Sequence, residues 1–161
     1  MNSLTMDGVA LVNEARLENL EILKELAQTL NLKTFDKETL KDLATAVKIE
    51  NGRIVFDGMK FFSQTGDWNI VGSVGFDGSL DYIGEVLLSD KVSASLTSQP
   101  GLTSSVASLF KDGSGRIKVP FRLGGNYAKP KISIDMGVKD KMKDKVKSKL
   151  DNAVQNFLKK K

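Results

Sequence analysis

The sequence predicts an α+β fold, an antiparallel β-meander that forms a curved sheet partly covered by N-terminal helices and a C-terminal Lys-rich helix. Apolar residues recur at helical spacing in residues 15–32 and 34–47. From residue 48 onward, apolar positions alternate with small or polar ones, and closely spaced turns separate the runs. An apolar stripe at three- and four-residue intervals returns in residues 138–161.

The N-terminal third is expected to be mostly helical. A short apolar run at residues 9–13 predicts one strand before the first helix. The helix over residues 15–32 has one apolar face of about four turns, made of Leu17, Leu20, Leu23, Ala27 and Leu30. Residues 34–47 predict a second, shorter helix, because Leu40, Leu43 and Val47 share a face and Asp36 begins a partial capping box.

Paired turn residues divide the middle of the chain into strands. Tight turns are predicted at Asn51-Gly52, Asp57-Gly58 and Asp77-Gly78, and another near Gly66. Because such short connections join neighbours, the strands should pair in sequential order. Residues 88–96 predict one more bend, into a strand that ends near Leu96. Pro120 and Pro130 cannot donate a ladder hydrogen bond, so we place them on an edge or at strand ends.

Large apolar side chains occupy alternate positions of the predicted strands, so one face of the sheet must be covered by something. Helices covering it would make it a core, whereas partial cover would leave an apolar groove. The strand from Trp68 to Phe76 spans about 26 Å, comparable to an extended acyl chain, and Gly72 leaves room against the backbone. The groove residues that we predict are Trp68, Ile70, Gly72, Val74, Phe76, Tyr82, Val86, Val119 and Phe121.

The composition argues against catalysis. The chain has no Cys and no His, which removes thiolate sites, the usual general base and the commonest transition-metal ligand. Its carboxylates fall at predicted turns or solvent positions, and its glycine-rich stretches lack the spacing of a phosphate loop. We therefore expect no enzymatic activity, no catalytic residue, no metal and no cofactor.

The basic charge is concentrated at the C-terminus. Residues 138–161 contain nine Lys against three Asp, a charge of +6, so the rest of the +4 chain carries −2. This predicted helix has three interpretations: it packs on the sheet, it lies on an anionic membrane surface through Lys141, Lys145 and Lys149, or it binds nucleic acid. Nucleic acid is the least favoured partner, because no aromatic stacking motif accompanies the lysines.

Two stretches resemble the C-terminal region of AsmA-like proteins. They are "FDKETLKDLATAVKIENGRIVFDGMKFFSQTGDWNIVGSVGFDGSLDYIGEVLLS" and "IKVPFRLGGNYAKPKISID", and the likeness extends over residues 9–135. The resemblance implies an AsmA-like C-terminal α+β domain at residues 1–137, with the basic helical tail at 138–161 outside it. It also implies a periplasmic location, as part of a longer chain anchored in the inner membrane of Gram-negative bacteria.

The expected function is that of a non-enzymatic envelope module. The resemblance implies a contribution to outer-membrane assembly and phospholipid handling, since related bridge-like proteins carry acyl chains along an apolar β-sheet groove. The expected partners are a phospholipid or other acyl-chain lipid, an envelope protein and the remainder of the longer chain. The alternative is a protein–protein interaction module that docks a partner through its tail helix or a sheet edge. The sequence has neither a run of about 18 apolar residues nor a signal-peptide pattern, so the given chain should be soluble.

Overall fold

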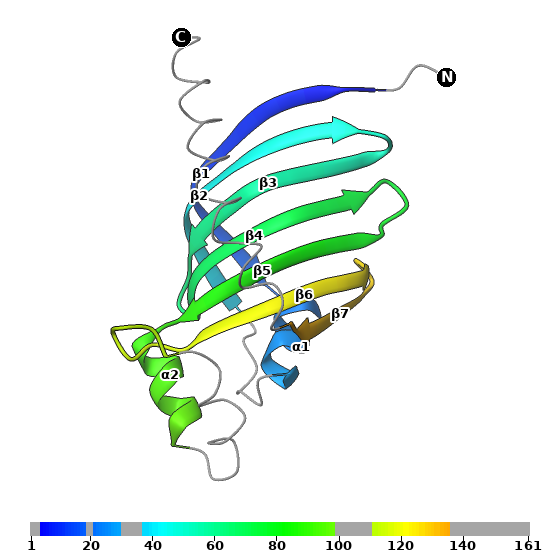
Figure 1. Ribbon diagram of the computed structural model, residues 1–161. Coiled ribbons are helices and arrows are strands. Elements are labelled where there is room, and N and C mark those ends of the chain that lie inside the picture. The colour runs from blue at the N-terminus through cyan, green and yellow to red at the C-terminus, as the bar shows by residue number, and fades with distance from the viewer. Residues whose placement is uncertain (1–3, 19–20, 30–36, 99–110, 136–161) are drawn as a thin grey trace.

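Seven antiparallel strands form one open, curved sheet in sequential order (Figure 1). The computed structural model describes residues 4–18, 21–29, 37–98 and 111–135. The strands are β1 (Met6–Glu18), β2 (Lys37–Glu50), β3 (Arg53–Phe62), β4 (Gly66–Gly75), β5 (Leu80–Leu88), β6 (Lys118–Asn126) and β7 (Lys129–Ile134). Two short helices, α1 (Glu21–Thr29) and α2 (Asp90–Thr97), complete these parts of the chain.

The predicted α+β class with several N-terminal helices is wrong, because the fold is mostly antiparallel sheet. Residues 14–18 continue strand β1, and residues 37–47 belong to β2. Leu40 faces the groove described below, and Val47 pairs with Phe56, which faces it too. Regular alternation cannot place residues seven apart on one face. Near Asp42, which has a φ of 53°, the pairing with β3 is irregular and the alternation shifts by one residue. Leu40 and Val47 therefore lie on one face of a strand at a spacing that is also typical of a helix.

The sequential meander was predicted correctly, and so were the turns at Asn51-Gly52, at Asp77-Gly78 and near Gly66. Asp57-Gly58 is not a turn: it forms a bulge inside β3, where the pairing with β4 shifts between Phe56 and Met59. Gly58 has a φ of 80°, which glycine adopts easily. Both kinds of site favour a positive φ, so the dipeptide alone does not distinguish them.

The predicted strand ending near Leu96 is also wrong, because residues 90–97 form α2. Ser89 caps this helix, its side chain accepting a hydrogen bond from the Val92 backbone amide at 3.4 Å. Pro130 lies in the edge strand β7, as expected, and Pro120 is the third residue of β6, where β7 has ended. The strand predicted at residues 9–13 lies within β1.

The two faces of the sheet differ in chemistry. The convex face carries ion pairs between neighbouring strands, such as Lys118–Glu85 at 3.4 Å and Arg122–Asp81 at 3.9 Å. The concave face is apolar, and the register aligns its side chains in rows across the strands. Three of these rows are Phe61-Trp68-Val86-Val119, Met59-Ile70-Gly84-Phe121 and Phe56-Gly72-Tyr82-Leu123. The curvature therefore encloses an apolar concavity.

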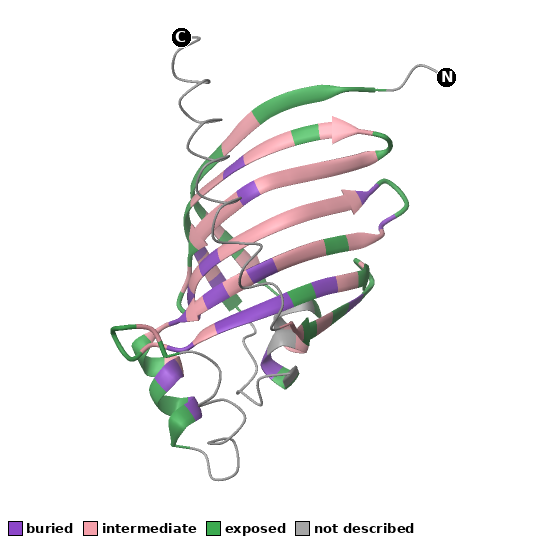
Figure 2. Cartoon of the chain, in the orientation of Figure 1, coloured by how far each residue is buried: buried purple, intermediate pink, exposed green. Residues whose placement is uncertain are grey.

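One end of the concave face is sealed into a core, which we call the end core (Figure 2). It consists of the buried side chains of Val86, Leu88, Leu96, Ile117 and Val119, and the buried Trp68, Phe121 and Leu123 of the groove lining continue the same apolar cluster. Helix α2 contributes Leu96, and its Ser93 hydroxyl donates to the Leu88 carbonyl at 3.3 Å and accepts from the Ile117 amide at 3.1 Å. These bonds fix α2 against the ends of β5 and β6.

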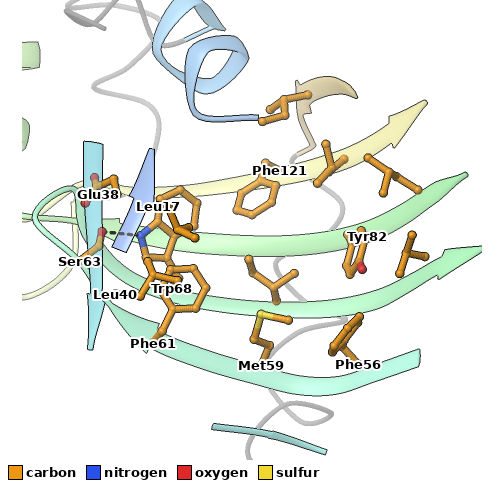
Figure 3. Close-up of a pocket in the computed structure, with 15 residues that line it drawn as sticks. Leu17, Glu38, Leu40, Phe56, Met59, Phe61, Ser63, Trp68, Tyr82 and Phe121 are labelled. Carbon is orange, nitrogen blue, oxygen red and sulfur yellow. Dashed lines mark hydrogen bonds between the residues drawn. The ribbon is translucent and has the colours of Figure 1, made fainter. Parts of the chain in front are cut away.

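Strands β1 and β2 bend so that their distant halves cross the concave side behind β4 and β5 in the view of Figure 1. As a result Leu17 and Leu40 lie close to Trp68 (Figure 3). Helix α1 packs against β7 at the other edge of the sheet. The concave face is thus covered at one end and along one edge, and the rest of it forms the candidate site.

Candidate functional site

The concave face contains an apolar groove with a volume of about 350 Å³. Its lining comes from all seven strands: Leu17, Glu38, Leu40, Phe56, Met59, Phe61, Ser63, Trp68, Ile70, Val74, Leu80, Tyr82, Phe121, Leu123 and Ile132. Most of these side chains are only half-buried, so the groove opens to solvent. Small-molecule sites typically occupy about 300–1,000 Å³ and are mainly apolar, so the groove has the size and lining of a ligand site.

An aromatic cluster forms the closed end of the groove (Figure 3). Trp68 stacks on Phe61, with ring centroids 5.6 Å apart, and meets Phe121 edge-on at 5.8 Å. The Trp68 indole nitrogen donates to the Ser63 hydroxyl at 3.0 Å. The hydrogen bond satisfies the single polar atom of the indole, so the ring presents an apolar surface to the groove.

Two glycines let aromatic rings lie flat along the wall. A Cβ at Gly84 would come within 2.6 Å of the Phe121 ring, and one at Gly72 within 2.7 Å of the Tyr82 ring. Gly72 also has a φ of 150°, which side-chain-bearing residues rarely adopt. The space beside Gly72 is therefore filled by Tyr82, and the expectation that it would admit an acyl chain is wrong.

Among the described residues that line the groove, Glu38 is the single carboxylate. It is 2% exposed, and it accepts hydrogen bonds from the Gln64 amide at 3.2 Å and from the Thr65 hydroxyl. Burial raises the pKa of Glu38 above its ordinary value of 4.5. Hydrogen bonds from Gln64, Ser63 and Thr65 act in the opposite direction and lower this pKa, but their effect is smaller than that of burial. Glu38 thereby ties β2 to the β3–β4 turn and holds the closed end of the groove together.

The opposite part of the groove wall carries a neutral hydroxyl. Burial raises the pKa of Tyr82 to about 12, and the charge of Arg53 acts in the opposite direction. Tyr82 therefore stays protonated at any physiological pH. Its ring lies 6.2 Å from that of Phe56, and both face the groove (Figure 3).

The nine predicted groove residues divide into four groups, one of which is Gly72, whose neighbouring space Tyr82 fills. Five of them line the groove: Trp68, Ile70, Val74, Tyr82 and Phe121. Val86 and Val119 are 0% exposed and belong to the end core, because α2 covers them. Phe76 is 61% exposed at the β4–β5 turn, beyond the paired part of the strand. Lys141, Lys145 and Lys149 lie outside the described residues.

Several residues that line the groove were not predicted from the sequence. Leu17, Glu38 and Leu40 were assigned to helices, because the apolar residues around them recur at helical spacing. The structure places them in strands β1 and β2. Phe56, Met59 and Phe61 were divided by the supposed turn at Asp57-Gly58. The spacing between this dipeptide and Asn51-Gly52 was the available clue, because turns at both would leave only residues 53–56 for the strand between them, shorter than the usual length of about five or six residues.

We expect Glu38 to make the stability of the protein fall as pH rises. The folded state binds this proton more tightly than the unfolded chain, so the stabilisation is complete below pH 4.5 and is lost as pH rises through the raised pKa. No His is present to titrate between about pH 5 and 8. Chemical denaturation in pH steps from 4.5 upward should show the slope in the wild type and a flatter profile in Glu38→Gln, which keeps an acceptor for Gln64. Equal slopes would contradict this assignment.

Within the described ranges, no three His, Cys, Asp or Glu side chains come together in a way that could hold a metal ion. No helix in the described part of the chain is long and apolar enough to cross a bilayer. Comparisons of the chain with protein-family models, with curated proteins and with solved structures found no match. The groove is therefore the feature on which a functional proposal can be based.

Proposed function

We propose that this protein is a non-enzymatic lipid-handling module that holds an acyl chain of a phospholipid or another lipid in the groove. The observation that carries the proposal is the groove itself, an open concavity lined by apolar side chains from seven strands. Its one carboxylate, Glu38, is nearly buried and hydrogen-bonded to the protein at the closed end. The exposed wall is uncharged, which suits a hydrocarbon ligand and not a phosphate or a sugar.

The dimensions and energetics suit an acyl chain. From Trp68 to Val74 the strand rises over six residue steps, about 20 Å. Each methylene removed from water contributes about 0.8 kcal/mol, so even a partly covered chain would be held against the cost of ordering it. A lipid headgroup would remain outside, where water solvates it.

The AsmA-like resemblance supplies a context for this proposal. Phospholipid handling and outer-membrane assembly in the periplasm, as part of an inner-membrane-anchored protein, are the role that we propose for such a groove. The open sheet is compatible with that role, since an acyl chain can enter along the length of the concave face without a lid having to move.

Trp68 allows a direct test, because it is the only Trp of the chain and lines the groove. A fatty acid with a nitroxide on its acyl chain, added below its micellar concentration, should quench Trp68 fluorescence in a saturable way. A water-soluble nitroxide without the acyl chain is the control, and it should quench weakly because the indole is 7% exposed. Equal quenching by the two probes, or no saturation, would overturn the proposal.

A protein-docking role is the second candidate, and strand β1 favours it. Among the described strands, β1 has a neighbour on one side only, and its thirteen residues contain neither Pro nor Lys, the residues that commonly protect sheet edges. Leu11 and Val12 are exposed on it. Native mass spectrometry of gently purified protein distinguishes the two roles, because lipid adducts support the first and a lipid-free mass in a stable protein assembly supports the second.

A further inference from the structure

Exposed apolar side chains gather at one end of the sheet, which we call the hairpin-tip end. It comprises the start of β1 and the turns β2–β3, β4–β5 and β6–β7, all on the right of Figure 1. Of seven large apolar side chains exposed in the described residues, four lie here: Leu4, Met6, Phe76 and Tyr127. Scattered exposed apolar residues are ordinary, but this concentration at one end is not.

Hydrogen bonds join the turns β2–β3, β4–β5 and β6–β7 into one continuous ledge. The Phe76 amide donates to the Gly52 carbonyl at 2.9 Å, and the Tyr127 amide donates to the Gly78 carbonyl at 3.0 Å. The Asn126 side chain also donates to the Asp77 carbonyl at 3.2 Å. These bonds join three successive hairpins, so the two aromatic rings are presented from a fixed backbone. Phe76 is 61% exposed and Tyr127 70% exposed.

The groove leads to this end. Val74 and Leu80 line the groove and are the last paired residues before the β4–β5 turn. Phe76 follows only two residues later. The other end is closed by the end core and by the Glu38 contact with the β3–β4 turn. An acyl chain that enters along the strand direction must therefore enter past the tips.

We propose that the hairpin-tip end docks on a lipid bilayer, with Phe76 and Tyr127 at headgroup level, so that acyl chains pass from the bilayer into the groove. This inference rests on the proposed function. Tyr and other amphipathic rings favour the bilayer interface, and a ledge of hydrogen-bonded turns presents no unsatisfied strand edge to it. The docked bilayer occupies the one end of the groove that the protein leaves open.

The charges of the tips define which bilayer they suit. Residues 4–7, 48–53, 75–81 and 126–131 contain four basic side chains (Lys48, Arg53, Lys129, Lys131) and four acidic ones (Asp7, Glu50, Asp77, Asp81). The net charge is zero, so docking should occur on zwitterionic phosphatidylcholine and depend little on salt. Binding through the Lys-rich residues 138–161 would instead require anionic lipid and low salt.

The first experiment is flotation of the full chain with phosphatidylcholine vesicles in about 0.5 M salt, where charge interactions are screened within a few ångströms. The wild type should float. The double variant Phe76→Ser/Tyr127→Ser should bind roughly tenfold more weakly, since interfacial binding scales with the apolar area inserted. Phe62→Ser is the matched control, because Phe62 is 52% exposed at the opposite end of β3 and should not affect flotation.

The second experiment places a reporter at each end. In a Trp68→Phe background, Phe76→Trp should show blue-shifted emission on vesicles and quenching by bilayer-resident nitroxide lipids, whereas Phe62→Trp should show neither. Equal quenching at the two positions, or solvent-like emission from both, would overturn the inference, and the latter would leave the tips as a contact for a protein. If Trp68 of the wild type still reports fatty-acid binding in vesicle-free solution, the proposed function survives that failure.

Discussion

Replacing Val86 with Asp is expected to unfold the domain, whereas the same change at Val74 should leave it folded and abolish acyl-chain binding. Val86 is 0% exposed in the end core, where an unpaired carboxylate costs several kcal/mol. That cost is comparable to the whole stability of an ordinary domain, about 5–15 kcal/mol. Val74 is half-buried on the groove wall, so its substituted carboxylate would reach water and place a charge beside the ligand.

Circular dichroism during thermal unfolding measures the first effect, and quenching of Trp68 by the nitroxide fatty acid measures the second. Val74→Thr is the matched control, because it keeps the β-branched shape without a charge and should bind nearly as the wild type does. If both Asp variants unfold, the concave face is a sealed core at both positions and the groove proposal fails. If both fold and bind, neither position has the environment described.

Gly72→Ala is expected to destabilise the protein by about 2–4 kcal/mol. The added Cβ would lie 2.6 Å from the Cα of Tyr82, and it would also meet the Asp81 carbonyl. These are backbone atoms of the paired strand, which cannot move without breaking the β4–β5 ladder. The φ of 150° adds strain for any residue with a Cβ.

Gly8→Ala is the matched control, since Gly8 lies in β1 with nothing within 4 Å of an added Cβ and no positive φ. This change should be neutral or stabilising by up to about 1 kcal/mol, because Ala restricts the unfolded chain. Urea unfolding of the two variants beside the wild type compares them directly. Similar midpoints for Gly72→Ala and the wild type would show that the strands part at this position without cost.

The sequence alone predicts a large part of this protein, namely an antiparallel meander in sequential order, three of its turns and an apolar face on its middle strands. These features are local. Asn51-Gly52 and Asp77-Gly78 favour tight hairpins whatever surrounds them, and alternation assigns Trp68, Ile70 and Val74 to one face. Five groove residues follow from that alternation.

Only the tertiary structure decides what covers the face. Val74 and Val86 both point to the concave face, yet Val74 is half-buried in the groove wall and Val86 lies in the end core. The difference comes from Leu96 of α2 and from the bend of β1 and β2, which brings Leu40 and Glu38 to the concave side. Periodicity records which way a side chain points within its own strand. It carries no information about segments distant in sequence, and those segments determine whether an apolar position becomes core, groove or exposed tip.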